Sequence, residues 1–231
     1  MPKLETLGLR RNIGQLLARL GPVADALHYT ILAVDVESFN APGRTNPHRV
    51  VVRSGLYRAV EDALAASGVR WRGCHRTDLG DGVLVLAPGA YPKAVFGERV
   101  PQELAKNLGA HNSGHAPEER IRLRMALHAG EVTRDAHGFT GSAIIHAFRL
   151  LDSPAVKDAL AGSDGDIAVI ASNWFYEEVI RHSKFGDLAG YVSVFAAVKE
   201  TAARAWVHVP AIDAPAMCVT RSPTRPASSE Q

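Results

Sequence analysis

Two aspartates that follow apolar runs are the residues of this 231-residue sequence best suited to binding a cation. Asp35 comes near the end of the run Tyr29–Phe39 (YTILAVDVESF), and Asp81 lies within Cys74–Leu86 (CHRTDLGDGVLVL). An aspartate that closes a core strand and an aspartate at the tip of a hairpin can meet across adjacent strands. Because hard divalent cations prefer carboxylate oxygens, the pair predicts a binding site for such a cation.

Each aspartate also has a purely conformational interpretation. Gly80-Asp81-Gly82 is a hairpin turn signal in its own right, because Gly and Asp tolerate positive φ. Asp35 can simply end a strand. Taken singly, each aspartate is more often structural than catalytic, and the functional interpretation depends on the further motifs described below.

Length and composition indicate a globular protein. The chain is long enough for one domain with appendages, and its 46% hydrophobic and 22% charged residues are ordinary for a soluble fold. A formal net charge of +2 gives no reason to expect a nucleic-acid partner. Cys74 and Cys218 are too far apart in sequence to form a metal-ligand motif. Without a signal peptide or an apolar run of membrane-spanning length, we expect a cytoplasmic protein with no membrane insertion.

The first half of the sequence predicts a helix, a strand and a second helix. Residues 1–27 carry leucines at helical spacing and predict an amphipathic helix that packs on the main domain or on a partner subunit. A strand over 30–36 and a loop over 40–48, rich in Pro, Gly and Asn, follow. Asn46 is expected to cap a helix that runs to about residue 66.

The second half of the sequence extends this pattern. We predict hairpin arms over 69–76 and 83–87, followed by a helical stretch over 92–110 whose main part begins at Pro101. A polar loop over 111–119, a strand over 120–131 and a helix over 144–151 come next. The last predicted elements are a strand over 166–170, a helix from the Ser172 cap to Ile180, and strands over 191–198 and 205–209. The early order of strand, helix, strand, strand, helix and strand is the split βαβ arrangement of ferredoxin-like α+β folds. We therefore predict a ferredoxin-like βαββαβ core in an extended antiparallel sheet over 28–210, followed by a disordered tail over 211–231.

Four motifs in this order resemble the class III nucleotidyl cyclase domain, the catalytic domain of adenylate and guanylate cyclases. The motifs are Asp35-Val36-Glu37-Ser38-Phe39, Leu79-Gly80-Asp81-Gly82, His128-Ala129-Gly130-Glu131-Val132 and, in altered form, Gly141-Ser142-Ala143-Ile144-Ile145-His146-Ala147-Phe148-Arg149-Leu150. The resemblance covers roughly residues 29–209. More narrowly, the set is similar to the divergent bacterial branch that includes the Pycsar anti-phage pyrimidine cyclases, which make cyclic UMP or cyclic CMP.

The resemblance implies a reaction and its metal site. In that family, the ribose 3′-hydroxyl of a nucleoside triphosphate attacks its own α-phosphate and releases pyrophosphate, with the help of two Mn²⁺ or Mg²⁺ ions. Asp35, Asp81 and the carbonyl of Val36 would hold both metals. Backbone amides around Ser38 and Phe39 would receive the β- and γ-phosphates if they led into a helix N-terminus.

The resemblance also implies a second set of residues and a partner. Arg149 matches the arginine that stabilises charge on the pentavalent phosphorus, and Lys199 matches the lysine that binds the triphosphate. Family sites lie at a dimer interface, with metals from one subunit and Arg149, Lys199 and the base-binding groups from the other. We therefore expect a homodimer with two composite sites.

Two departures from the family pattern bear on the substrate. Ile145 stands where the family has the asparagine that holds the ribose, so either His146 or a neighbour substitutes for it or the activity is impaired. Thr77 stands where purine cyclases have lysine or glutamate. This absence, with nearby Arg76 and Thr140, favours a pyrimidine base, and UTP over CTP. A cyclic nucleotide made this way would be read by a separate effector, as in anti-phage defence signalling.

Two alternatives remain open on the sequence. One is a purine cyclase of the adenylate or guanylate type. The other is a nucleotide-binding dimerisation module that has lost turnover, which Ile145 favours. The presence of both Asp35 and Asp81 argues for an active cyclase, because a domain without turnover does not require a metal-binding pair.

Overall fold

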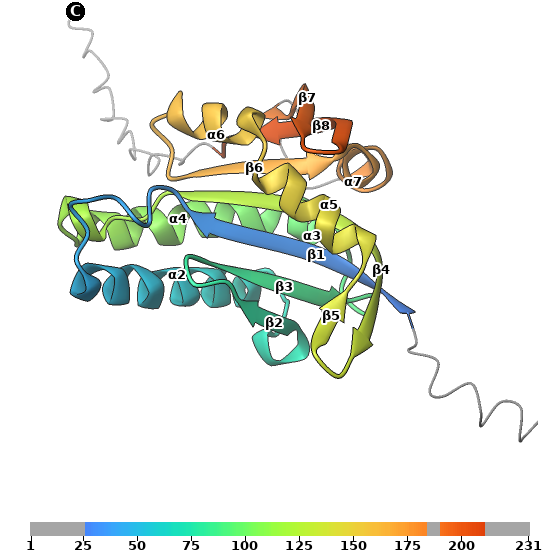
Figure 1. The fold of residues 1–231 in the computed structure, drawn as a ribbon, viewed down its shortest axis with the longest axis horizontal. Coiled ribbons are helices and arrows are strands. Elements are labelled where there is room, and N and C mark those ends of the chain that lie inside the picture. Colours follow the sequence, from blue (N-terminus) through green and yellow to red (C-terminus); the bar gives the residue numbers. More distant parts are fainter. Residues whose placement is uncertain (1–25, 184–189, 211–231) are drawn as a thin grey trace, which may run out of the picture.

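The computed structural model describes residues 26–183 and 190–210, which form an eight-stranded sheet with helices on both faces (Figure 1). The helix predicted over the first residues and the tail predicted over 211–231 lie outside the described residues, except that residues 26 and 27 belong to the first strand.

The elements follow one another along the chain with short connections. The strands are β1 (Ala26–Val36), β2 (His75–Asp78), β3 (Gly82–Pro88), β4 (Leu123–Asp135), β5 (Gly138–Thr140), β6 (Ile167–Ser172), β7 (Val192–Val198) and β8 (Thr201–His208). The α-helices are α2 (Asn46–Ala66), α3 (Ala94–Gly97), α4 (Arg99–Ser113), α5 (Ser142–Leu151), α6 (Pro154–Ala161) and α7 (Asn173–Glu178). Short 3₁₀ turns occur at Trp71–Gly73, Pro117–Glu119 and Ile180–His182.

The topology contains the predicted ferredoxin-like core. β1, α2, β2, β3, α4 and β4 follow one another, and their strands lie in the order β2-β3-β1-β4 with antiparallel neighbours. β1 and β2 therefore run in the same direction with β3 between them, which is the split βαβ arrangement. β6 then pairs in parallel with β4, and β8 and β7 add antiparallel strands at the far edge. The predicted α+β fold with an extended, mostly antiparallel sheet is confirmed.

The two faces of the sheet are covered by different helices. α2 and α4 pack on one face, and α5 and α6 pack on the other (Figure 1). Along β1, Leu32 and Val34 face the α2 and α4 layer, whereas Ile31 and Ala33 face α5. Because side chains alternate along a strand, Asp35 lies on the α5 face. Burial on both faces also explains why β1 is almost continuously apolar in sequence.

Several local predictions differ from the structure. Thr45, and not Asn46, is the N-cap of α2. The predicted first hairpin arm is a 3₁₀ turn for part of its length, and strand geometry begins only at His75. The helix predicted to end at residue 110 continues to Ser113, because the buried side chain of Asn112 hydrogen-bonds both backbone groups of Ile121.

One helix was not predicted. α6 follows α5 after a break at Asp152 and Ser153, and it begins with Pro154, which is well suited to a first helical position. Its apolar side chains Val156 and Leu160 are buried against the sheet. A helix of only eight residues gives too short a periodic pattern to be recognised in the sequence.

Candidate active site

Asp35 and Asp81 lie side by side at the end of β1. Asp35 pairs in register with Gly82, and the N–H of Val36 donates to the carbonyl oxygen of Asp81 at 2.9 Å. The two carboxylates are close enough for the charge of Asp81 to contribute to raising the pKa of Asp35. The structure therefore brings together the two aspartates that the sequence singled out, from β1 and from the tip of the β2–β3 hairpin.

Glycines allow the hairpin tip to approach β1 this closely. A Cβ atom at Gly82 would lie 2.1 Å from the carbonyl oxygen of Val34, so no larger residue fits without displacing one of the two strands. Gly80 has φ of +88°, a conformation that L-residues other than Gly rarely adopt. The Gly-Asp-Gly sequence is therefore needed both for the turn and for the contact with β1.

Arg124 of β4 is a component of this site that the sequence analysis missed. Its Nε and Nη2 donate to the two carboxylate oxygens of Asp35 at 2.8 and 2.7 Å. Burial raises the pKa of Asp35 to about 6, while the charge and hydrogen bonds of Arg124 act in the opposite direction. The alternation of arginines with apolar residues over 120–131 was a signal for polar groups on one face of a strand, but it gave no partner for them.

The residues present are compatible with a divalent cation. The described residues contain no cluster of three or more His, Cys, Asp or Glu side chains that could hold a metal ion. Two neighbouring carboxylates are nevertheless a common protein contribution to a Mg²⁺ site that is completed by water and substrate phosphates. A cation that used both oxygens of Asp35 would have to displace the guanidinium of Arg124.

The expected phosphate-binding backbone does not lead directly into a helix. Ser38 has φ of +53° and its carbonyl accepts a hydrogen bond from the N–H of Ala41, so the chain turns at this point. α2 begins only at Asn46, after the inserted loop. The amides of Ser38 and Phe39 therefore lie in a turn beside Asp35 and do not form a helix N-terminus.

Arg149 and Lys199 form a second group, located elsewhere in the fold. Nη2 of Arg149, on α5, lies 3.2 Å from a carboxylate oxygen of Glu200, and Lys199-Glu200 is the two-residue turn between β7 and β8. Lys199 has φ of +51°, an unusual conformation for a residue other than Gly. The tertiary fold thus brings the two predicted phosphate-contacting residues to the same part of the surface.

An open pocket of about 620 Å³ lies beside this second group. It is lined by His128, Gly130, Glu131, Ser142, Ala143, Ile145, His146 and Thr201. The side chain of Ile145 is apolar and exposed.

The rings of His128 and His146 lie 4.7 Å apart, and Nδ1 of His128 is 2.8 Å from the hydroxyl of Ser172. Burial, followed by the neighbouring His146 and His28, lowers the pKa of His128 to about 4, so this ring is neutral at pH 7.

Within one chain, the β7–β8 turn that carries Lys199 lies far from Asp35. Asp35 pairs with Arg124 near the start of β4, whereas the β7–β8 turn extends past the end of β6 at Ser172. Figure 1 shows β2 and β3 at one edge of the sheet and β7 and β8 at the other. With a rise of about 3.3 Å per residue and about 4.8 Å between strands, we place Asp35 roughly 25–30 Å from Lys199. One substrate therefore cannot contact both Asp35 and Lys199 of the same chain.

The three residues predicted to bind the base do not share one face. Thr77 pairs with Leu84, whose side chain belongs to the α5 face that also carries Asp35. Arg76 is on the opposite face, where its guanidinium stacks over the ring of Trp71 at 4.7 Å. Thr140 lies on β5, and the neighbouring Phe139 ring is 4.7 Å from His75 of β2. The fold thus brings the strands of Thr77 and Thr140 together and directs Arg76 away from them.

Comparison with known proteins identifies the fold. No family model and no curated protein matches the sequence. Among solved structures, the chain is similar to an adenylate/guanylate cyclase/hydrolase from Silicibacter pomeroyi, with 21% identity, a TM-score of 0.57 and coverage of 81% of this chain and 99% of the other. It is also similar to the guanylyl cyclase Cya2, with 16% identity, a TM-score of 0.57 and coverage of 80% and 92%.

A third match is the monomeric guanylyl cyclase domain of the RhoGC fusion protein from the fungus Blastocladiella emersonii, with 15% identity, a TM-score of 0.50 and coverage of 80% and 97%. At these identities the similarity establishes the fold, which is that of class III nucleotidyl cyclase domains, as the four sequence motifs indicated. No helix within 26–183 and 190–210 is both long and apolar enough to cross a membrane.

Proposed function

We propose that this protein is a metal-dependent nucleotidyl cyclase, which converts a nucleoside triphosphate to a 3′,5′-cyclic nucleotide and pyrophosphate. The observation that carries the proposal is the meeting of Asp35 and Asp81 at the end of β1 in a fold of the class III cyclase type. Two neighbouring carboxylates, one of them buried beside an arginine, are an energetically costly arrangement for a purely structural turn.

The proposed roles of the residues follow from their chemistry. Asp35 and Asp81, with the carbonyl of Val36, would hold two Mn²⁺ or Mg²⁺ ions, which would acidify the 3′-hydroxyl and neutralise phosphate charge. Arg149 would donate hydrogen bonds to the α-phosphate as negative charge develops on its oxygens. Lys199 would contact the triphosphate, whose β- and γ-phosphates leave as pyrophosphate when the 3′-oxygen bonds to the α-phosphorus.

The separation of the two groups supports a homodimer. Asp35 and Asp81 cannot act on the same substrate as Lys199 of their own chain, because Asp35 and Lys199 lie roughly 25–30 Å apart by strand geometry. A second copy related by a twofold axis would supply each missing group and create two equivalent composite sites. In this arrangement the salt bridge from Arg149 to Glu200 opens or shifts when substrate binds.

We further propose that the base is a pyrimidine, with UTP preferred over CTP. Thr77 is exposed on the face that carries Asp35, and it offers one short hydroxyl where purine cyclases have a long charged side chain. Thr140 lies on a strand brought close to β2 by the contact between His75 and Phe139. The product would act through a separate effector, and anti-phage signalling is the role that the sequence resemblance suggests.

The test is incubation of the purified protein with each of the four ribonucleoside triphosphates and Mn²⁺ or Mg²⁺, with products identified by mass spectrometry. We expect cyclic UMP from the wild type, and none from Asp35→Ala or Asp81→Ala. Asp158→Ala, at an exposed position on α6, is the matched control and should retain activity. Faster cyclisation of ATP or GTP than of UTP would overturn the pyrimidine assignment.

A second candidate function has one observation in its favour. Ile145 lies exposed at the pocket beside Arg149, and its side chain cannot hydrogen-bond a ribose. A chain that binds nucleotide and dimerises without turnover would fit this substitution. Nucleotide binding by the wild type, measured calorimetrically, without a cyclic product from any of the four triphosphates would favour this alternative over the cyclase.

A further inference from the structure

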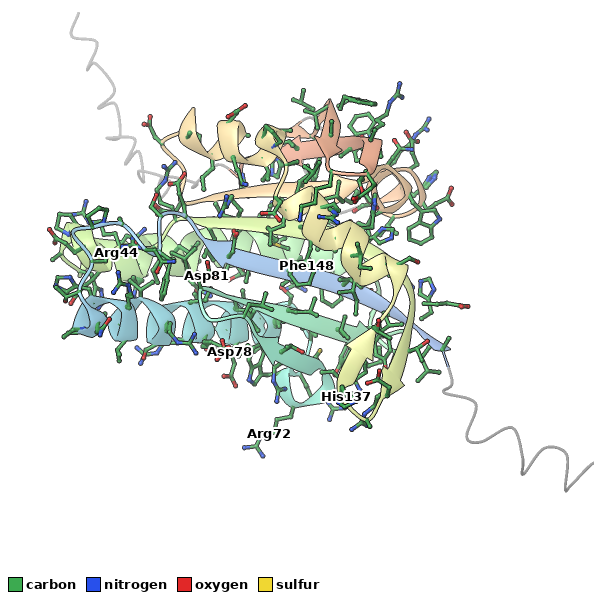
Figure 2. All side chains as sticks on the ribbon, viewed as in Figure 1. Arg44, Arg72, Asp78, Asp81, His137 and Phe148 are labelled. Carbon is green, nitrogen blue, oxygen red and sulfur yellow. The ribbon has the colours of Figure 1, made fainter. Side chains whose placement is uncertain are left out.

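Arg53 of α2 makes several contacts with the β2–β3 hairpin. Its Nη1 donates to one carboxylate oxygen of Asp78 at 3.1 Å, and its Nη2 lies 2.5 Å from the other oxygen. Nη1 also donates to the carbonyl oxygen of Gly80. Figure 2 shows Asp78 and Asp81 on this hairpin, with α2 beside them. One guanidinium therefore binds both a side chain and the backbone of the hairpin tip.

Asp78 in turn holds the turn itself. Its carboxylate accepts a hydrogen bond from the N–H of Gly80 at 2.8 Å, so both backbone polar groups of Gly80 are engaged. Hydrogen bonds from Arg53 and from Gly80 are the main causes that lower the pKa of Asp78 to about 2. The carboxylate therefore stays charged, and the contact stays intact, throughout the neutral pH range.

Hydrogen bonds hold both peptide groups that flank Asp81, one from Arg53 and one from Val36 of β1. The carbonyl of Gly80 belongs to the peptide group before Asp81 and is held by Arg53. The carbonyl of Asp81 belongs to the peptide group after it and accepts from the N–H of Val36 at 2.9 Å. Fixing both flanking peptide groups fixes the backbone of Asp81 and hence the direction in which its side chain leaves the chain.

Tyr57, also on α2, hydrogen-bonds Asp78 as well, and β2 itself does little to hold the hairpin. β2 has only four residues, all exposed, and it is an edge strand paired with β3 alone. Gly80, within the turn, adds backbone freedom that the folded state has to restrict. Without the contact to α2, the tip would be restrained by β1 and β3 only.

From these contacts we propose that Arg53 and Asp78 are positioning residues, which set the affinity of the Asp35–Asp81 site for a divalent cation by fixing Asp81. The inference rests on the proposed function, because it takes Asp81 as a metal ligand. Neither Arg53 nor Asp78 touches the substrate; both act through the hairpin backbone.

Electrostatics alone predicts the opposite result for Arg53, which makes the proposal testable. A positive charge near the site repels a cation, so removal of the Arg53 charge should tighten Mn²⁺ binding, whereas loss of the hairpin contact should weaken Mn²⁺ binding.

The experiment titrates Mn²⁺ into the nucleotide-free, full-length protein and measures free Mn²⁺ by electron paramagnetic resonance. For Arg53→Met we expect about 3- to 10-fold weaker binding, the size of effect that loss of a bidentate, charge-assisted contact produces.

Arg53→Lys is the more discriminating variant. It keeps the charge and the helix propensity but loses the planar fork that binds Asp78 and Gly80 together, so Mn²⁺ should again bind more weakly. A merely electrostatic role leaves this variant unchanged. Arg181→Met, which removes a similar exposed Arg–carboxylate contact with Glu177 on the other side of the fold, is the control and should bind Mn²⁺ like the wild type.

Hydrogen exchange gives a readout that does not depend on metal binding. The amides of Val36, Leu79 and Gly80 donate to Asp81, Gly82 and Asp78, respectively, so they report directly on the hairpin tip. We expect their exchange to be faster in Arg53→Met and Arg53→Lys than in the wild type, and unchanged in Arg181→Met.

The outcomes separate this proposal from the proposed function. Unchanged Mn²⁺ affinity and unchanged exchange in both Arg53 variants, with a wild type that binds Mn²⁺, overturn the positioning role and leave the cyclase assignment standing. Tighter Mn²⁺ binding by Arg53→Met also overturns it. A wild type that binds no Mn²⁺, even with a non-hydrolysable triphosphate present, overturns the proposed metal site and the role of Arg53 in it together.

Discussion

Arg124 of β4 donates hydrogen bonds to both carboxylate oxygens of Asp35 on the neighbouring strand β1, at 2.8 and 2.7 Å. Both side chains are mostly buried, at 16% and 15% relative exposure, so the pair is shielded from solvent screening. The same carboxylate is the central proposed metal ligand. In this structure Asp35 is therefore neutralised by an arginine at the position where a cation would bind.

Replacing Arg124 should destabilise the fold by an amount that depends on the geometry of the replacement. Arg124→Met leaves a buried carboxylate without its partner, and we expect a loss of about 3 kcal/mol in the free energy of unfolding. Arg124→Lys keeps the charge but not the bidentate fork, so we expect a loss of about 1–2 kcal/mol. Urea denaturation at pH 7 measures both. Equal stability of all three proteins would show that the pair contributes nothing.

Asp35 should make the wild type less stable as the pH rises from about 4 to 6. Burial raises the pKa of this carboxyl from 3.8 to about 6, so the folded state binds its proton more tightly than the unfolded chain. The corresponding stability is fully present below pH 4 and is lost as the pH rises through 6. Relative to the wild type, Asp35→Asn should gain about 2–3 kcal/mol across this interval. A constant difference between the two denaturation series would contradict this prediction.

His128 should give a pH dependence of opposite sign. Burial lowers the pKa of its ring from 6.5 to about 4, so the folded state binds a proton less readily than the unfolded chain. Its contribution is complete above pH 6.5 and is lost as the pH falls towards 4. His128→Gln should therefore gain about 3 kcal/mol relative to the wild type as the pH is lowered from 7 to 4.

His137→Gln, at an exposed position in the β4–β5 turn (Figure 2), is the surface control for that experiment. The contributions of Asp35 and His128 to the free energy of unfolding oppose each other between pH 4 and 6. The plot of this free energy against pH should therefore be flatter for the wild type than for Asp35→Asn or His128→Gln. The single variants are needed to resolve the two effects.

Gly82→Ala tests the close approach of the hairpin to β1. The added Cβ atom would lie 2.1 Å from the carbonyl oxygen of Val34, so either β1 or β3 has to move, and we expect a loss of about 3 kcal/mol in stability. Gly43→Ala is the matched control, since nothing lies within 4 Å of its added Cβ atom. A thermal denaturation midpoint for Gly82→Ala equal to that of Gly43→Ala would mean that the two strands are not held in this register.

Complementation tests the composite site. Asp81→Ala and Arg149→Ala should each be inactive, because each homodimer lacks one component at both of its sites. Mixed subunits should recover about a quarter of wild-type activity, since half of randomly assembled dimers are heterodimers and each has one intact site. Subunit exchange is verified by native mass spectrometry of differently tagged chains. Verified exchange without recovered activity would exclude a site shared between two chains.

The sequence determined the features that local chemistry specifies. A doubly buried strand is recognisable as an apolar run, and a Gly-Asp-Gly between two such runs is recognisable as a hairpin tip, so Asp35 and Asp81 could be placed together without coordinates. Ser172 was recognised as a helix cap for the same reason, and its hydroxyl does accept from the N–H of Phe175. The order of these elements was enough to predict the ferredoxin-like core.

Tertiary structure alone decided which distant side chains meet and which sheet face each occupies. Arg124 and Asp35 are 89 positions apart, and only the β1–β4 register places them opposite each other. Arg76 and Thr77 are neighbours in sequence, yet strand alternation puts them on opposite faces. The distance between Asp35 on β1 and Lys199 in the β7–β8 turn likewise follows from strand order and register. No local sequence pattern encodes how far apart two such strands lie in the sheet.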